Sequence, residues 1–290
     1  MDKIGVARSS LLAAVGLTGF KLLVGISTGS LGIISEAIHS GLDLVAALLT
    51  LLAVRVSQKE PDREHQFGHG KFENLSALAE TMLLVVTCVW IVYEAIHRLR
   101  TGALDIEVNV WSYTVIAVAI VVDFSRSRAL YRAAKKFNSQ ALEADALHFS
   151  SDIFSSAVVL LGLVCYTFDL KAADSIASMI VALIVLGVSW RLGKRSIRVL
   201  VDTAPEGVSR NIEKLLQAYP DIEKVEDLRV RSSGAEIIVE MTLESNPGLS
   251  FGAAHDLSDR IEREIMSAVP RSHVHVHMEP SGHDRVIKAE

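Results

Sequence analysis

The stretch that decides the fold spans residues 30–54 and reads SLGIISEAIHSGLDLVAALLTLLAV. It is long enough to cross a bilayer, since a spanning helix needs about 20 mainly apolar residues. His39 and Asp43 nevertheless lie inside this apolar run. A charged side chain at the centre of a membrane helix costs about 2.5–3.5 kcal/mol on insertion scales, so such residues are usually retained for a function. The stretch therefore predicts a membrane-spanning helix that contributes two side chains to a functional site.

The rest of the chain contains further segments of this kind. The sequence has 290 residues, of which 50% are hydrophobic, and its mean hydropathy of +0.35 is too high for an ordinary soluble protein. Apolar segments cover residues 9–27, 32–56, 74–96, 110–124, 146–168 and 173–192. The fourth segment is short for a span unless its helix continues into the basic residues that follow. We expect a transmembrane domain of six helices over residues 1–204 and a soluble domain over residues 205–290.

The distribution of basic residues predicts the orientation in the membrane. Lys3 and Arg8 precede the first segment as in a signal peptide, but its apolar run is too long and lacks a clear cleavage site, so we expect a first helix. If both termini are cytoplasmic, the inner segments hold fifteen Lys and Arg residues and the outer loops three, as the positive-inside rule requires. The inner residues are Lys3, Arg8, Arg55, Lys59, Arg63, Lys71, Arg126, Arg128, Arg132, Lys135, Lys136, Arg191, Lys194, Arg195 and Arg198, and the outer ones are Arg98, Arg100 and Lys171.

We therefore expect a multi-pass integral protein of a bacterial inner membrane, with the soluble domain in the cytoplasm. The basic stretch at residues 126–136 could suggest nucleic acid as a partner. Its position beside two predicted spans favours the head groups of membrane lipids instead. We expect no nucleic acid partner.

A second apolar segment repeats the polar pair of the first. His39 and Asp43 are four residues apart, which places them on one face of a helix, one turn apart. The sequence ALHFSSD places His148 and Asp152 at the same spacing. Two imidazoles and two carboxylates are a ligand set that tetrahedral Zn²⁺ uses, at about 2.0–2.2 Å. The repeat favours an intramembrane metal site over the alternative, in which each pair is a hydrogen-bonded couple that braces two helices.

An acid precedes each pair by three residues, Glu36 before His39 and Asp145 before His148. The predicted topology runs the second helix inward and the fifth outward, so these acids lie on opposite sides of the site. One hypothesis is that each acid attracts or relays cations on its own side. The alternative, equally weighted, is that each caps or braces a helix.

The C-terminal residues alternate between helical and strand patterns. A helix is predicted over residues 206–218, strands over 224–231 and 236–243, a second helix over 251–268 and a third strand over 272–279. The period-two pattern of the last strand places His273, His275, His277 and Glu279 on one face. The αββαβ order predicts a small α+β domain, with two helices on one face of the sheet.

Taken together, the paired HxxxD motifs, the loop sequence FGHGK at residues 67–71 and the αββαβ tail resemble the cation diffusion facilitator family. The resemblance covers nearly the whole chain. It implies a homodimeric exporter that exchanges a divalent metal for protons, with a ferredoxin-like cytoplasmic domain that resembles metallochaperones, binds metal and dimerises. The resemblance associates histidine in both motifs with zinc transporters, and an aspartate in place of the first histidine with transport of Fe²⁺ or Cd²⁺ as well. Carboxylate-only sites suit Mn²⁺, which is a harder ion. Two imidazoles therefore favour Zn²⁺ as substrate over Fe²⁺, Co²⁺, Cd²⁺ or Mn²⁺.

The resemblance also implies roles for residues outside the two motifs. Asp62, His65 and His69 match a second, interfacial metal site, although a solvated polar loop is the alternative. Lys71 and Asp202 match a charge pair that holds the dimer between its two domains. His255, His277 and Glu279 match a binuclear site of the tail that could regulate transport. Glu226 and Glu240 stand where related zinc exporters carry His, so a solvated sheet face stays open as the alternative.

Two other functions compete with transport. A membrane-embedded, metal-dependent hydrolase would keep an open ligand position and a general base, but four ligands close the shell and no HExxH motif is visible. A metal-sensing receptor would signal through its soluble domain, but the tail has no kinase, nucleotide or DNA-binding signature. We therefore expect a transporter and not an enzyme.

Overall fold

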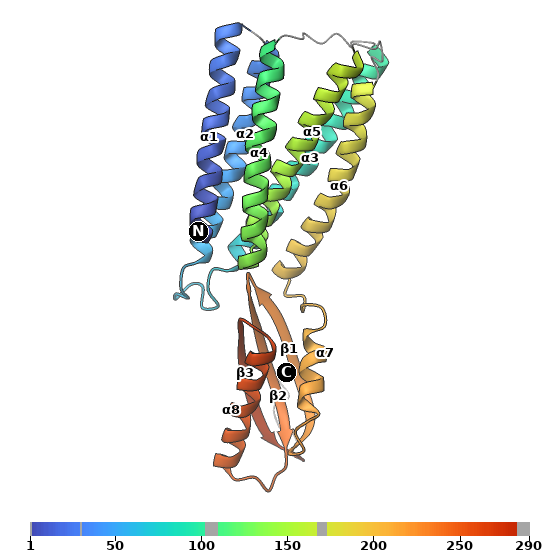
Figure 1. The fold of residues 1–290 in the computed structure, drawn as a ribbon. Coiled ribbons are helices and arrows are strands. Elements are labelled where there is room, and N and C mark those ends of the chain that lie inside the picture. The colour runs from blue at the N-terminus through green and yellow to red at the C-terminus, as the bar shows by residue number, and fades with distance from the viewer. Residues whose placement is uncertain (1, 30, 102–109, 167–172, 283–290) are drawn as a thin grey trace. The chain divides into compact units, whose positions relative to one another are not determined.

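The computed structural model describes residues 2–29, 31–101, 110–166 and 173–282 (Figure 1). The chain forms two compact units, residues 1–197 and residues 198–290. Each unit has its own apolar core, and each is described separately below.

The first unit is a bundle of six long helices that run side by side (Figure 1). Asp2 caps the first helix, since its side chain accepts a hydrogen bond from the backbone N–H of Gly5 at 2.9 Å. Gly29 ends this helix with a φ of 68°, a conformation that glycine adopts without strain. The helices are α1 (Lys3–Thr28), α2 (Leu31–Ser57), α3 (Lys71–Thr101), α4 (Val110–Phe137), α5 (Gln140–Tyr166) and α6 (Ala173–Leu200).

Several of the described helices are long and apolar enough to cross a membrane. By length and composition, four described helices or parts of helices could cross a membrane: Lys3–Thr28, Ala37–Ser57, Lys71–Thr101 and Ser175–Leu200. The fourth apolar segment does continue into the basic residues that follow it, because α4 extends to Phe137.

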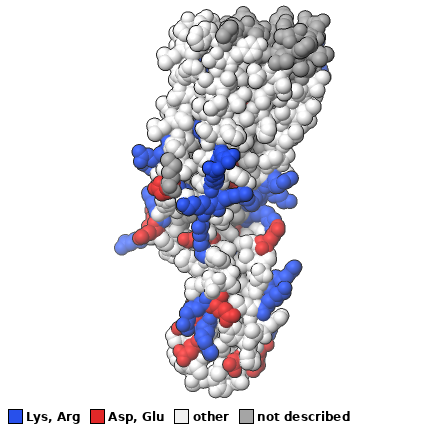
Figure 2. Space-filling view, in the orientation of Figure 1, with Lys and Arg blue, Asp and Glu red and all other residues white. Residues whose placement is uncertain are grey.

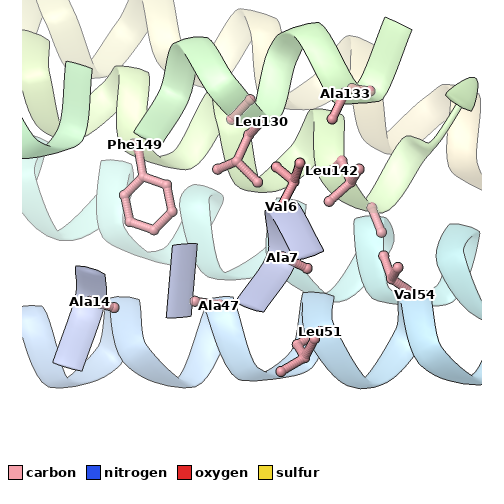
Figure 3. Close-up of a cluster of buried hydrophobic side chains, with 13 residues drawn as sticks. Val6, Ala7, Ala14, Ala47, Leu51, Val54, Leu130, Ala133, Leu142 and Phe149 are labelled. Carbon is pink, nitrogen blue, oxygen red and sulfur yellow. The ribbon is translucent and has the colours of Figure 1, made fainter. Parts of the chain in front are cut away.

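Small side chains bring the helices of the bundle close together. In α1, a Cβ added at Gly25 would lie 2.9 Å from Cγ1 of Ile34 and 3.1 Å from its backbone nitrogen, so α1 and α2 nearly touch there. One apolar cluster joins four helices around the fully buried Phe149 (Figure 3). Its buried members are Val6, Ala7, Ala14, Ala47, Leu51, Val54, Leu130, Ala133, Ala134, Ala141, Leu142, Ala146 and Phe149.

A polar contact connects the ends of several helices at the end of the bundle where α1 begins. The carboxylate of Glu73, at the start of α3, forms an ion pair with Lys3 of α1. It also accepts hydrogen bonds from Ser57 at 2.6 Å and from Ser139, which precedes α5. We call these four residues the Glu73 hub. Figure 2 shows Lys and Arg side chains concentrated at the same end, whereas the described surface beyond them is nearly uncharged.

The second unit confirms the predicted α+β class. It contains α7 (Val208–Leu216), β1 (Ile222–Ser233), β2 (Glu236–Ser245), α8 (Phe251–Ala268) and β3 (Ser272–Pro280). The sheet has the order β1-β2-β3, with β1 and β2 antiparallel and β2 and β3 parallel. A parallel pair needs a crossover, and α8 provides it. Both helices cover the same face, because their apolar residues form one core with Val239, Met241 and Leu243 of β2.

Candidate metal centre

The two HxxxD motifs meet between α2 and α5. One ligand atom each from His39, Asp43 and Asp152 lies within 4.8 Å of the others. His148 completes the group, since its Nε2 atom is 3.0 Å from Oδ1 of Asp43 and 3.8 Å from Oδ2 of Asp152. We call these four residues the cage. The equal spacing of the two motifs explains the convergence, because each motif presents both of its polar residues on one helix face.

The cage combines buried and accessible residues. Asp43 and His148 are 8% and 5% exposed, whereas His39 and Asp152 are half-buried. Nδ1 of His148 and Oδ2 of Asp152 are buried and have no hydrogen-bond partner among the residues that the structure describes. The site therefore offers imidazole and carboxylate groups whose hydrogen-bonding capacity is not used up by the protein.

Lys21 of α1 is a basic residue next to the cage that the sequence reasoning missed. It is buried, and its Nζ donates a hydrogen bond to the Ser40 hydroxyl at 2.7 Å. It is close enough to interact electrostatically with Asp43 and Asp152. A single lysine within the apolar segment 9–27 was the available signal, because an ionisable residue in a span indicates function by default.

Asp145 already faces a cation of the protein. Its Oδ2 accepts a hydrogen bond from the Ser10 hydroxyl at 3.2 Å, and that hydroxyl accepts one from Arg126 at 3.3 Å. The guanidinium of Arg126 also pairs with Asp123 at 3.2 Å and lies 3.4 Å above the ring centre of Phe149. These contacts link α1, α4 and α5, and they support the bracing alternative for Asp145. The side chain of Glu36 lies outside the described residues.

The loop between α2 and α3 forms the second predicted cluster. Ligand atoms of Asp62, His65 and His69 lie within 4.8 Å of one another. The carboxylate of Asp62 is 3.6 Å from Nδ1 of His65 and 3.4 Å from Nε2 of His69. It also accepts backbone hydrogen bonds from His65 at 2.7 Å and from Glu64 at 3.0 Å. The hydrogen bond from the His65 backbone is the main reason that the pKa of Asp62 is lowered.

Comparison with known proteins decides the family. Residues 7–201 match the family model described as the cation efflux transmembrane domain, and residues 204–281 match the one described as the cation efflux protein, cytoplasmic domain. The chain belongs to the cation diffusion facilitator family. It is therefore a cation efflux transporter, and its apolar helices make it an integral membrane protein.

Curated bacterial relatives named cation-efflux pump FieF resemble this family member over nearly their whole length. The protein of Klebsiella pneumoniae is 31% identical over 286 residues, which cover 97% of this chain and 93% of the relative. That of Cronobacter sakazakii is 30% identical over 279 residues, covering 94% and 91%. That of Serratia proteamaculans is 28% identical over 286 residues, covering 95% and 93%.

The tail residues that the resemblance to the cation diffusion facilitator family implied do not share one cluster in the described chain. In the parallel pairing, Glu240 is opposite His275, whereas His277 is opposite Thr242. Glu279 pairs with His277 at 3.2 Å, and His255, on α8, lies 3.9 Å from Asp259. The predicted alternation is present, since His273, His275 and His277 are exposed while Val276 is buried. Glu226 is exposed on β1.

The residues of the implied charge pair belong to different units. Lys71 begins α3 in the first unit, and Asp202 follows α6 in the second. Asp202 has a φ of 58°, and its carboxylate lies 3.7 Å from Arg231 of β1. The pairing of Lys71 with Asp202 stays a prediction.

Proposed function

We propose that this family member exports Zn²⁺ across a bacterial inner membrane in exchange for protons, and that the cage is the transport site. The observation that carries this proposal is the convergence of His39, Asp43 and Asp152, with ligand atoms within 4.8 Å, beside the Nε2 atom of His148. Two imidazoles and two carboxylates suit a tetrahedral zinc ion. The two carboxylates would balance the charge of a divalent cation, which lowers the cost of desolvating it.

The choice of Zn²⁺ as substrate is supported by the two histidines. Imidazole suits Zn²⁺, whereas carboxylate and water ligands suit harder ions such as Mn²⁺. His39 and His148 make half of the ligand set nitrogen. Mn²⁺ is therefore ranked below Zn²⁺, and Fe²⁺, Co²⁺ and Cd²⁺ are ranked below it because the family resemblance associates two histidines with zinc transporters.

Proton exchange is supported by the contact between His148 and Asp43. A proton shared by Nε2 and Oδ1, which are 3.0 Å apart, occupies the place where both atoms would hold a cation. Metal ligands must be deprotonated, so protons and metal compete for the same atoms. Alternating access would then load the cage with metal from the cytoplasm and with protons from the opposite side.

We further propose cytoplasmic termini and a homodimer. The concentration of basic side chains at one end of the bundle supports this orientation and contact with anionic lipid head groups there (Figure 2). Asp62, His65 and His69 would bind a second metal ion, and the exposed histidines of β3 would bind regulatory metal at the dimer interface. Lys71 and Asp202 would form a charge pair that holds the dimer between its membrane and cytoplasmic domains.

Flux measurements in sealed vesicles test the proposed function. Purified protein is reconstituted, a pH gradient is applied, and the uptake of Zn²⁺, Fe²⁺, Cd²⁺ and Mn²⁺ is compared in one preparation. We expect Zn²⁺ flux that depends on the gradient and is lost in Asp43→Ala. Zn²⁺ binding without flux would contradict export and favour a receptor, and flux that ignores the pH gradient would contradict proton exchange.

A further inference from the structure

Glu80 of α3 is a fully buried carboxylate outside the cage. Its side chain is 0% exposed. Oε1 accepts a hydrogen bond from the Thr50 hydroxyl of α2 and a second from the Ser76 hydroxyl at 3.2 Å. Oε2 is buried and has no hydrogen-bond partner among the described residues. Both hydroxyl groups that hold this side chain are electrically neutral.

The groups around Glu80 provide no lysine or arginine to balance an ionised carboxylate. From α5, the negative charge of Asp145 opposes ionisation of Glu80 while a protonated His148 favours it, and from α2 the facing group is the Thr50 hydroxyl. Two other buried acids of the bundle differ, because Asp123 is paired with Arg126 and Glu73 with Lys3. No Lys or Arg is paired with Glu80 in the part of the chain that the structure describes.

The burial of Glu80 determines its chemistry. A carboxylate that is removed from water without a paired cation is so costly that the group takes up a proton instead. The unpartnered Oε2 is the atom available to bond this proton, while Oε1 stays with Thr50 and Ser76. The negative charge of Asp145 further favours the neutral form of Glu80.

Filling the cage changes this electrostatic environment. A divalent cation between Asp43 and Asp152 offsets their two negative charges, and it acts on nearby groups as a positive charge. Thr50 lies seven residues from Asp43 on the same helix, which is about 10 Å along the axis. Charges at this distance interact strongly within the bundle, because little water screens them.

We propose that Glu80 is a proton-binding site coupled to the cage, which releases its proton when a divalent cation enters the cage and regains one when the cation leaves. In this step the O–H bond of the Glu80 carboxyl group breaks and the proton passes to water. The carboxylate that remains is stabilised by the hydroxyls of Thr50 and Ser76. The inference rests on the proposed proton-coupled transport and adds a proton carrier that is not a metal ligand.

The number of protons released on Zn²⁺ binding tests the inference. Zn²⁺ is titrated into the full-length protein by calorimetry in buffers with different ionisation enthalpies, for the wild type and for Glu80→Gln. Zn²⁺ that binds at the loop and tail sites releases the same number of protons in both proteins, so these protons cancel when the wild type and Glu80→Gln are compared. We expect Glu80→Gln, which mimics the protonated side chain, to release fewer protons per Zn²⁺, by up to about one. Release equal to that of the wild type would overturn the inference.

Two further variants sharpen this test. Glu143→Gln makes the same chemical change at a half-exposed residue of α5 that pairs with Arg195, and it should release as many protons as the wild type. Thr50→Val keeps Glu80 and the cage but removes the hydroxyl that stabilises the carboxylate. Its proton release should therefore shift to higher pH, and an unchanged pH profile would contradict the role of Glu80 even if Glu80→Gln fails to fold. If the wild type itself releases no protons, the proposed exchange fails and not only the role of Glu80.

Discussion

Nε2 of His148 on α5 lies 3.0 Å from Oδ1 of Asp43 on α2, although 105 positions separate them in the sequence. The contact joins one residue from each HxxxD motif, and it uses the histidine nitrogen that also faces Asp152 at 3.8 Å. A metal ion and a shared proton would therefore require the same atoms, which makes them alternatives rather than neighbours.

Asp43→Asn tests this relationship most directly. The change keeps the size of the side chain and a hydrogen-bond acceptor for His148, but it removes one negative charge from the cage. We expect Zn²⁺ transport in vesicles to fall at least about tenfold, since the loss of a charged partner costs more than 1.4 kcal/mol. Glu60→Gln, at an exposed loop position, is the control and should transport normally. Full transport by Asp43→Asn would exclude this carboxylate as an essential ligand.

His39→Asp should change which metal is transported. The substitution replaces a nitrogen ligand with oxygen and gives the cage three carboxylates, a set that suits harder ions. We expect the ratios of Fe²⁺ and Mn²⁺ flux to Zn²⁺ flux to increase, with each metal measured separately in one vesicle preparation. His255→Asp makes the same change on the exposed face of α8 and should leave these ratios unaltered. An unchanged ratio in His39→Asp would show that His39 does not determine selectivity.

Gly25→Ala should destabilise the contact between α1 and α2. The new Cβ would lie 2.9 Å from Ile34 Cγ1, so the two helices must separate. Overpacking of this kind costs about 1–3 kcal/mol, measurable as a lower unfolding temperature in detergent. Gly19→Ala is a matched control in the same helix, because its Cβ would meet no atom within 4 Å. Equal unfolding temperatures of the two variants would contradict a close approach at Gly25.

Arg126→Gln should destabilise the bundle more than the double variant Asp123→Asn/Arg126→Gln. Removing one partner of a buried ion pair leaves the other charge uncompensated, at a cost of about 3–5 kcal/mol. The double variant removes both charges, although Asp145 still loses its indirect link to Arg126. Unfolding measurements on the two single variants and the double variant provide the coupling energy. Additive effects would mean that the pair contributes no energy of its own.

The backbone hydrogen bonds to the Asp62 carboxylate should persist at mildly acidic pH. Hydrogen bonds from the backbone N–H groups of His65 and Glu64 lower the pKa of Asp62 from its ordinary value of 3.8. A lowered pKa means that this stabilisation is present above the ordinary value and is lost as the pH falls through the lowered one. We expect the hydrogen-exchange protection of these two amides, corrected for the intrinsic rate, to persist down to about pH 4. Asp62→Ala should remove the protection at neutral pH, whereas Asp62→Asn, which keeps an acceptor, should retain much of it. Loss of wild-type protection already between pH 5 and 6 would contradict this account.

The sequence predicted the cage better than its surroundings. The repeated HxxxD spacing defines a helix face, so the encounter of Asp43 with His148 follows from two facing helices. Lys21 and Glu80 occur singly, and no repeat marks them. The contact of Asp145 with Ser10 depends on how α1 packs against α5, which local spacing does not determine.

The tail shows the same limit. Alternation within β3 predicted that its histidines share a face, and they do. Which residue of β2 lies opposite each of them depends on the register of a parallel pair, and this register places Thr242 rather than Glu240 beside His277. The alternation of residues along β3 does not predict the register of the β2–β3 pair, because the crossover through α8 sets this register.

The Glu73 hub constrains how the bundle can move. Its carboxylate is bonded to Lys3, Ser57 and Ser139, which stand at the ends of α1, α2 and α5. A motion that spreads these ends apart must break these bonds and leave the buried carboxylate of Glu73 without its partners. A motion that spreads the opposite ends can leave them intact, with the helices swinging about a fixed pivot. Opening the bundle at the end where α1 begins therefore costs more free energy than opening it at the opposite end, and Glu73 is the residue that causes this difference.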